Sequence, residues 1–205
     1  RCTTTIPTAY LSRWANDGGH KYKVDGDVTF SQWTANMTPE QKQAFEVHVK
    51  QWRNRAADKK QYERYIERLG KENVPETFDK WQEMKYTELE AYSALKRGYK
   101  TIGEIERKSQ WSNTFKRKAV NTYWEFKRNG VEMSSHAISR FLDRCEGKYT
   151  LNDVSAMAHK PANYIQPDGR EVRYYDSLAI IYNTEKTEVV SVVERRNVKK
   201  EWRKL

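Results

Sequence analysis

The periodicity of this sequence changes at Asn129-Gly130. Before this point apolar residues recur every three or four positions over long stretches, a spacing that predicts amphipathic helices. After it come two short helical patterns and then runs rich in valine, isoleucine and tyrosine, which are typical of strands. The sequence therefore predicts an α+β fold: a mostly helical N-terminal part, followed by a small domain of two helices and an antiparallel β-sheet.

Turn and helix-start signals predict three regions. Residues 1–37 are turn-rich and are expected to be irregular or to hold a small hairpin. Residues 38–130 form a basic helical region, which opens at Thr38-Pro39-Glu40-Gln41 with a capping threonine and an early proline. One long helix or two stacked helices are predicted from about 39 to 69. Residues 131–205 form the α+β domain.

Glycine and proline set the boundaries in the rest of the chain. A second helical region is predicted from Thr77 to Gly130, with interruptions at Gly98 and Gly103. The remaining predicted helices and strands are, in order, Ser134 to near Gly147, Thr150 to before Pro161, 163–165, 171–175, 178–182 and 188–193.

The charge balance favours a polyanionic partner. The chain has 38 Lys+Arg and 28 Asp+Glu, a net charge of +10, which is typical of nucleic-acid-binding proteins, although a merely soluble basic protein is the alternative. Residues 131–205 carry 13 Lys+Arg and 11 Asp+Glu, so +8 of this charge belongs to the first 130 residues. We therefore expect nucleic-acid affinity mainly in the helical part and local chemistry in the C-terminal domain.

Cysteine usage and hydropathy bear on the cellular setting. Cys2 and Cys145 do not make a disulfide framework, and a reduced, cytosolic setting is expected. No apolar run is long enough to cross a bilayer, and the N-terminus lacks a signal-peptide core, so no membrane partner is expected. Because the chain opens with Arg, it is expected to be a fragment of something longer.

The last helix of the basic region carries a dense set of cations. An apolar stripe is expected to pack, and it comprises Trp111, Phe115, Ala119, Thr122, Tyr123 and Phe126. The cations of the opposite side are candidates for phosphate contact, with plain solvation as the alternative: Lys116, Arg117, Lys118, Lys127 and Arg128.

The segment Ser134–Cys145 is the main candidate for chemistry. Its apolar face, which is expected to pack, consists of Ile138, Phe141, Leu142 and Cys145. A second stripe carries His136, Arg140 and Arg144 at successive i+4 steps. A histidine in the first helical turn is disfavoured as imidazolium and can act as a base, while two arginines can bind a phosphate. Together with a hydroxyl partner, this pattern suffices for metal-free RNA cleavage; an ordinary exposed helix face is the alternative.

The predicted sheet offers partners for this helix without identifying one. Strict alternation would place Val189, Ser191 and Val193 on one face of the last strand. Ser191 either hydrogen-bonds locally or faces a site, and Tyr175 is a further candidate. The histidines His20, His48 and His159 are isolated from one another, and no phosphate-binding or dinucleotide-binding loop occurs, so neither a metal site nor a cofactor is predicted.

The C-terminal domain resembles the barnase/EndoU/colicin/RelE-type ribonucleases of polymorphic toxins and phage proteins. The resemblance rests on Ser135 to Arg144, on Tyr175, on Ile181-Tyr182-Asn183 and on Val189 to Val193. It implies a ribonuclease that needs no metal or cofactor and that an immunity or inhibitor protein restrains. The active-site residues that it implies are His136, Arg140, Arg144, Ser191 and Tyr175.

The upstream part resembles the C-terminal half of tailed-phage minor head proteins of the Mu F-like type. The matching pieces are Arg1-Cys2-Thr3-Thr4, Thr29 to Trp33 and Phe78 to Tyr86. Such proteins sometimes end in a toxin-like nuclease or ADP-ribosyltransferase. The resemblance implies a place in the virion and in the bacterial host cytoplasm, with RNA, phage DNA and other phage head proteins as partners. Two alternatives stay open: a structural head protein that binds packaged DNA without catalysis, and an ADP-ribosyltransferase-like toxin.

Overall fold

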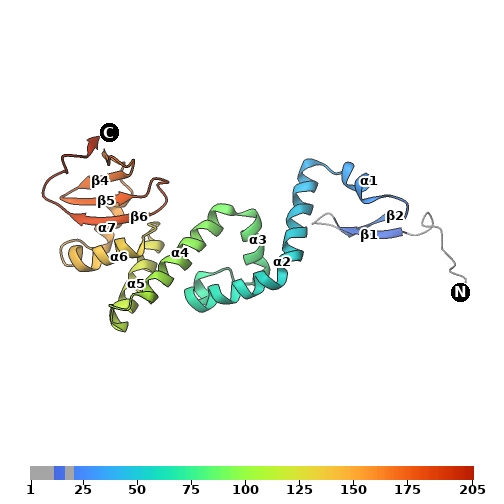
Figure 1. Ribbon diagram of the computed structural model, residues 1–205, viewed down its shortest axis with the longest axis horizontal. Helices are drawn as coiled ribbons and strands as arrows, with labels where there is room; N and C mark the ends of the chain where they lie inside the picture. Colours follow the sequence, from blue (N-terminus) through green and yellow to red (C-terminus); the bar gives the residue numbers. More distant parts are fainter. Residues whose placement is uncertain (1–11, 17–20) are drawn as a thin grey trace, which may run out of the picture. The chain divides into compact units, whose positions relative to one another are not determined.

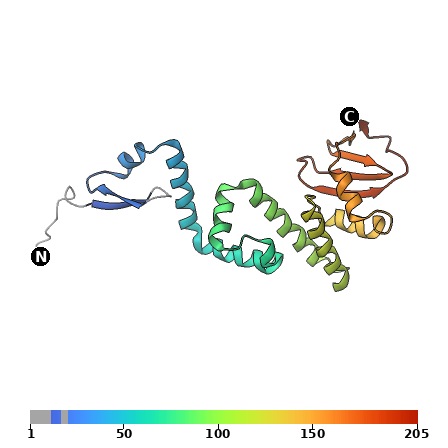
Figure 2. The same ribbon diagram turned by 180° about the vertical axis from the view of Figure 1, so that it is seen from behind.

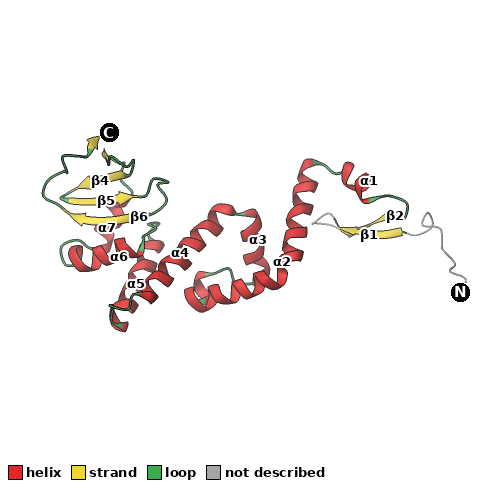
Figure 3. Cartoon of the chain, viewed as in Figure 1, coloured by secondary structure: helices red, strands yellow, loops and turns green. Residues whose placement is uncertain are grey.

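The structure is a computed structural model that describes residues 12–16 and 21–205. The chain forms two compact units, one ending at Lys96 and one running from Arg97 to Leu205 (Figure 1). Helices dominate as far as Arg128, and the strands of an antiparallel sheet gather near the C-terminus (Figure 3). The α+β fold class predicted from the sequence is confirmed. The boundary predicted between residues 130 and 131 lies inside the second unit.

The first unit combines a β-hairpin with helices. Its elements are β1 Ser12–Asn16, β2 Lys21–Asp25, α1 Phe30–Ala35, α2 Pro39–Leu69, the 3-10 turn η2 Lys71–Asn73, α3 Phe78–Thr87 and the start of α4 Leu89–Arg107. β1 and β2 pair antiparallel, so the hairpin alternative for residues 1–37 holds in the described part. Predictions that concern Cys2, His20 or residues 1–11 lie outside the described residues.

The long helix α2 starts as the sequence predicts. The side chain of Thr38 accepts a hydrogen bond from Gln41 N at 3.3 Å, and the side chain of Gln41 accepts one from Thr38 N at 2.9 Å. This reciprocal capping satisfies two backbone donors that the helix leaves unpaired. α2 then continues unbroken to Leu69, which confirms one long helix rather than two.

Trp81 on α3 is the centre of the aromatic core of the first unit. Its side chain is fully buried, and the ring centroids of its aromatic neighbours lie 5.8–6.5 Å away. These neighbours are Tyr62, Tyr65, Phe78 and Tyr92. Burial of such large rings, together with edge-to-face contacts, supplies most of the packing between α2 and α3.

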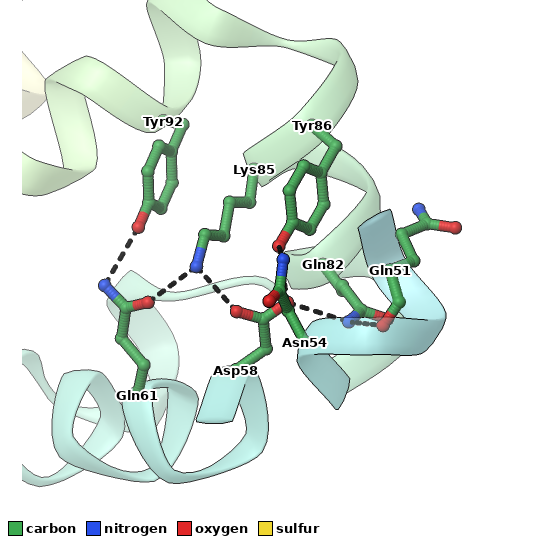
Figure 4. A network of polar contacts seen from close by, with 8 residues as sticks. All are labelled: Gln51, Asn54, Asp58, Gln61, Gln82, Lys85, Tyr86 and Tyr92. Atoms are coloured by element: carbon green, nitrogen blue, oxygen red, sulfur yellow. Dashed lines mark hydrogen bonds and ion pairs between the residues drawn. The ribbon is translucent and has the colours of Figure 1, made fainter. Parts of the chain in front are cut away.

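A buried polar network also joins α2 to α3 (Figure 4). The carboxylate of Asp58 is 2% exposed and accepts hydrogen bonds from Lys85 Nζ at 2.6 Å, Gln82 Nε2 at 2.8 Å and Tyr86 Oη at 3.0 Å. Lys85 also donates to Gln61 Oε1 at 2.8 Å. A buried charge needs such partners, because an unpaired one is strongly destabilising. The network therefore fixes the register of α3 along α2.

The second unit places helices against a five-stranded sheet. Its elements after α4 are α5 Asn113–Arg128, α6 Ser135–Arg140, the π-helix η3 Phe141–Cys145, α7 Leu151–Ala158, β3 Tyr164–Ile165, β4 Glu171–Tyr175, β5 Leu178–Tyr182, β6 Val189–Glu194 and β7 Arg203–Lys204. The strand order is β6-β5-β4-β3-β7, with every pair antiparallel. The predicted strands are confirmed; β7, which has two residues, was not predicted.

The two faces of this sheet are covered differently. Tyr182 Oη donates to Ala158 O at 3.0 Å, so α7 packs on the face that carries Tyr182. Figure 2 shows the ribbon of this helix, in orange, lying across the strands. The other face holds a smaller core that the C-terminal segment closes, and it consists of Val172, Ala179, Ile181 and Trp202. A side chain on β6 therefore meets either the helical layer or this second core.

A β-bulge in β6 overturns the predicted arrangement of its side chains. Tyr182 pairs with Val189 and Ile181 pairs with Ser191, so Val190 is an extra residue in the strand. Because paired residues of antiparallel strands share a face, Ser191 lies with Ile181 and Val189 lies with Tyr182. The prediction that Val189 and Ser191 share a face is wrong, since strict alternation assumes an unbroken register.

The predicted helix interruptions at Gly98 and Gly103 are also wrong. α4 runs through both glycines, and the chain breaks instead at Glu88 and in the connection that follows Arg107. Both glycines are buried. A Cβ on Gly98 would lie 2.8 Å from Tyr123 Oη on α5, so the glycine allows a close approach of two helices. Tertiary packing thus outweighs the weak intrinsic preference of glycine against helix.

Replacing Gly98 with alanine is expected to destabilise the second unit by about 1–3 kcal/mol, because the new methyl group overpacks a core in which Tyr123 cannot yield. Tyr123 is fully buried, and its hydroxyl donates to Glu132 Oε1 at 2.6 Å. Urea unfolding followed by circular dichroism measures the change. The control is the same substitution in a Tyr123→Phe background: there the clash is gone, and Gly98→Ala should be neutral or stabilising. Equal losses in both backgrounds would contradict the role given to the hydroxyl.

Candidate functional site

His136 lies in the first turn of α6, where Ser134 caps the helix. Ser134 Oγ accepts a hydrogen bond from Ala137 N at 3.1 Å, so the predicted helix start is confirmed. His136 is exposed, whereas Ala137 and Ile138 beside it are fully buried. The face predicted to pack is buried throughout, and it comprises Ile138, Phe141, Leu142 and Cys145. One side of the helix therefore packs into the core, and another side exposes His136.

Arg140 contacts His136 directly across one helical turn. Arg140 Nε donates to His136 Nε2 at 3.4 Å, and only a ring nitrogen without a proton can accept this bond. The pKa of His136 lies below its ordinary value of 6.5, first because partial burial disfavours the charged ring, and then because Arg140, Lys108 and Arg144 lie nearby. The pKa shift and the bond from Arg140 both favour the neutral form of His136, with Arg140 in contact and Lys108 and Arg144 close enough to act on the ring electrostatically.

Lys108 acts on His136 electrostatically, and a hydrogen bond between α4 and α6 brings the two helices together. Ser135 Oγ, next to His136, donates to Glu104 Oε2 at 2.6 Å, and Glu104 lies one turn before Lys108. Sequence reasoning missed Lys108 as a partner of His136, because the two residues belong to different helices and no spacing connects them. Its place in a basic stretch was the one available signal.

A second buried cluster fixes the segment that leads into α6. Glu132 accepts hydrogen bonds from Tyr123 Oη at 2.6 Å and from Lys127 Nζ, and Arg97 Nε lies 4.0 Å from its carboxylate. Burial raises the pKa of Glu188, which also feels the negative charge of Glu132. The backbone of Glu132 accepts a bond from Val189 N at 2.8 Å, so the cluster holds the segment along β6.

The structure does not gather all five candidate catalytic residues. Arg144 is exposed and, with Arg140, lowers the pKa of His136. Ser191 lies with Ile181 on the face of the sheet that is turned away from α7. Tyr175 Oη donates to Pro161 O at 2.8 Å, which fastens the end of β4 to the segment after α7. In the part of the chain that the structure describes, no hydrogen bond or ion pair joins Ser191 or Tyr175 to His136.

The five candidate phosphate-binding cations of α5 have different surroundings. Lys116 Nζ donates to Glu106 O at 2.7 Å, Lys118 Nζ contacts Glu146 Oε2 at 2.5 Å, and Lys127 pairs with Glu132. Arg117 and Arg128 are exposed, and no ion pair to either is found among residues 12–16 and 21–205. Of the stripe expected to pack, Trp111 and Phe115 are half-buried and the rest is buried, namely Ala119, Thr122, Tyr123 and Phe126.

Other features of the described chain offer no competing centre of chemistry. Among the described residues, no three His, Cys, Asp or Glu side chains are grouped as metal ligands would be. A groove of about 660 Å³ lies between α2 and α3, and its lining mixes acidic, basic and apolar side chains. The same described residues contain no helix with the length and apolarity needed to span a membrane.

Comparisons with protein-family models, with curated proteins and with solved structures found no match. The chemistry of the site is therefore the basis for any functional assignment. That site is the exposed His136 with Arg140, Lys108 and Arg144.

Proposed function

We propose that the second unit is a metal-independent endoribonuclease in which His136 is the general base. One observation carries this proposal: His136 accepts a hydrogen bond from Arg140 as a neutral imidazole while three cations lie close by. A neutral imidazole can take a proton near neutral pH, and the cations attract the phosphate that follows it. The likeness to barnase/EndoU/colicin/RelE-type ribonucleases supports the same assignment.

In the proposed reaction the 2′-hydroxyl of the substrate gives its proton to His136. The 2′-oxygen then bonds to the adjacent phosphorus, and the bond from phosphorus to the 5′-oxygen breaks. The 5′-oxygen takes a proton from a water molecule as it leaves, and the hydroxide so formed takes the proton back from His136, so the products are a 2′,3′-cyclic phosphate and a 5′-hydroxyl. Arg140 keeps further N–H donors besides the one on His136, and with Lys108 it stabilises the charge that builds up on the phosphorane.

A substrate pair tests this function. A single-stranded RNA oligonucleotide in EDTA should be cut to fragments ending in a 2′,3′-cyclic phosphate, while the matching all-2′-deoxy oligonucleotide should stay intact because it has no internal nucleophile. Gel electrophoresis and mass spectrometry of the fragments read out both results. The proposal would be overturned if folded protein left the RNA intact or cut the RNA and the all-2′-deoxy oligonucleotide equally.

A second candidate function is DNA binding without catalysis in a phage head. It is favoured by the exposed Arg117 and Arg128 on α5 and by the +8 charge of the first 130 residues. Binding of this kind weakens steeply with salt, because each phosphate contact releases counterions. Salt-dependent binding of duplex DNA together with intact RNA would favour this candidate. Either function fits a virion-associated protein that meets nucleic acid in the host cytoplasm.

A further inference from the structure

We propose that Trp111 and Lys108 form a nucleobase subsite beside His136, which takes an unpaired base of single-stranded nucleic acid. The position of the scissile phosphate beside this subsite rests on the proposed function. The stacking of a base on Trp111 does not depend on it. Trp111 was expected to be part of a packing stripe, yet its side chain is half-buried. Among the described residues its indole N–H has no acceptor, so one polar edge of the ring is available to a ligand.

Hydrogen bonds close the turn that carries Trp111. Trp111 N donates to Lys108 O at 3.2 Å, and Lys108 N donates to Ile105 O at 3.2 Å, so the connection between α4 and α5 is a closed turn. Lys116 Nζ ties the start of α5 back to Glu106 O at 2.7 Å. A ring that is positioned in advance loses little entropy when a base stacks on it.

Packing leaves part of the ring accessible. Phe115 meets Trp111 edge to face, with centroids 4.7 Å apart and planes at 75°. Lys108 Nζ lies 5.9 Å from the centroid of the same ring. Phe115 supports the indole from one side, and Lys108 places a positive charge over the ring. An aromatic ring next to a cation is the pairing that binds a base and its phosphate.

Lys108 connects this ring to the proposed reaction centre. It is one of the cations that lower the pKa of His136, and it also stands over the Trp111 ring. A phosphate held by Arg140 and Lys108 would therefore have a neighbouring base within reach of Trp111. In a duplex the bases stack on one another and cannot stack on a protein side chain. The ligand is therefore a single strand or an unpaired loop.

Binding of an uncleavable probe tests the subsite independently of catalysis. The probe is a fluorescent 2′-O-methyl RNA oligonucleotide, single-stranded or annealed to its complement, and anisotropy gives its Kd. Trp111→Ala should weaken single-strand binding by about 5-fold to 150-fold, as expected for the loss of one stacked base. Duplex binding should be unchanged, and Trp111→Phe should restore most of the single-strand affinity. The matched control is Trp52→Ala, which removes a 73% exposed tryptophan from α2 in the first unit and should change neither Kd.

The outcomes separate this inference from the proposed ribonuclease activity. If Trp111→Ala weakens binding of the single strand while the wild type does not cut RNA, the subsite stands and the nuclease proposal fails. If the wild type cuts RNA and Trp111→Ala, with an unchanged circular dichroism spectrum, binds the single strand as well as the wild type does, the subsite is overturned. If Trp111→Ala misfolds, Trp111→Leu takes its place, because leucine fills space without a ring. Loss of single-strand affinity in folded Trp111→Leu but not in Trp111→Phe would support the subsite, and unchanged affinity in folded Trp111→Leu would overturn it.

Discussion

Replacing His136 with alanine is expected to lower kcat/KM for RNA cleavage by about 10²-fold to 10⁴-fold, the usual contribution of a positioned general base. Because His136 is exposed, its replacement should disturb the fold little, and the variant should unfold at nearly the same temperature as the wild type. His48→Ala is the matched control, because His48 lies on α2 in the first unit. Undiminished cleavage by folded His136→Ala would remove His136 from the mechanism.

The pH dependence of cleavage carries a second signature of His136. Because its pKa is lowered, the neutral ring persists as the pH falls through 6.5, and kcat/KM should decline only below that value. Arg140→Gln removes one of the cations that disfavour the imidazolium, so the pKa of His136 should rise and the acid limb should move to higher pH. NMR titration of the His136 ring measures this pKa without substrate. A pKa unmoved by Arg140→Gln would contradict the contact described between the two side chains.

Short-range patterns in the sequence predicted the helices and strands of the fold well. The capping residues Thr38 and Ser134 mark the starts of α2 and α6, and the burial of Cys145 follows from helical spacing. These predictions depend on contacts within one turn of helix or between nearest neighbours along a strand. The unpredicted run of α4 through Gly98 shows where such reasoning fails, because the tolerance for glycine there comes from Tyr123 on another helix.

The candidate site was predictable only in part, for the same physical reason. His136 and Arg140 lie four residues apart on one helix, so spacing placed them together. Ser191 was assigned by analogy and alternation, but the bulge at Val190 determines its face, and no local pattern marks that bulge. Lys108 and Trp111 come from the turn between two other helices. The effect of Lys108 on His136 depends on how α4 packs against α6, which no short spacing in the sequence indicates.

Loss of the Asp58 carboxylate should strongly destabilise the first unit. Asp58→Ala leaves the Lys85 ammonium, which is 19% exposed, with Gln61 as its remaining hydrogen-bond acceptor. It also removes the acceptor of Tyr86 Oη and one of the two acceptors of Gln82 Nε2, which keeps its bond to Gln51 O (Figure 4). Breaking a buried ion pair by removing one partner destabilises a protein by about 3–5 kcal/mol, because the other charge stays buried without compensation. The loss should appear as faster hydrogen exchange of the amides in α2 and α3, measured in the full chain.

Two further variants decide whether the buried charge causes this loss. Asp79 lies on α3, as Lys85 does, and forms an exposed ion pair with Arg55. Such surface pairs contribute little to stability, so the amide hydrogen-exchange rates of Asp79→Ala should match those of the wild type. The double variant Asp58→Ala, Lys85→Met removes both charges while keeping an apolar chain in place of the lysine stem. It should be more stable than Asp58→Ala alone, since no uncompensated ammonium remains. Equal destabilisation of the single and the double variant would instead assign the effect to the hydrogen bonds of Gln82 and Tyr86. In that case the network would hold α3 on α2 through neutral donors, and the pairing of Lys85 with Asp58 would be incidental to the fold.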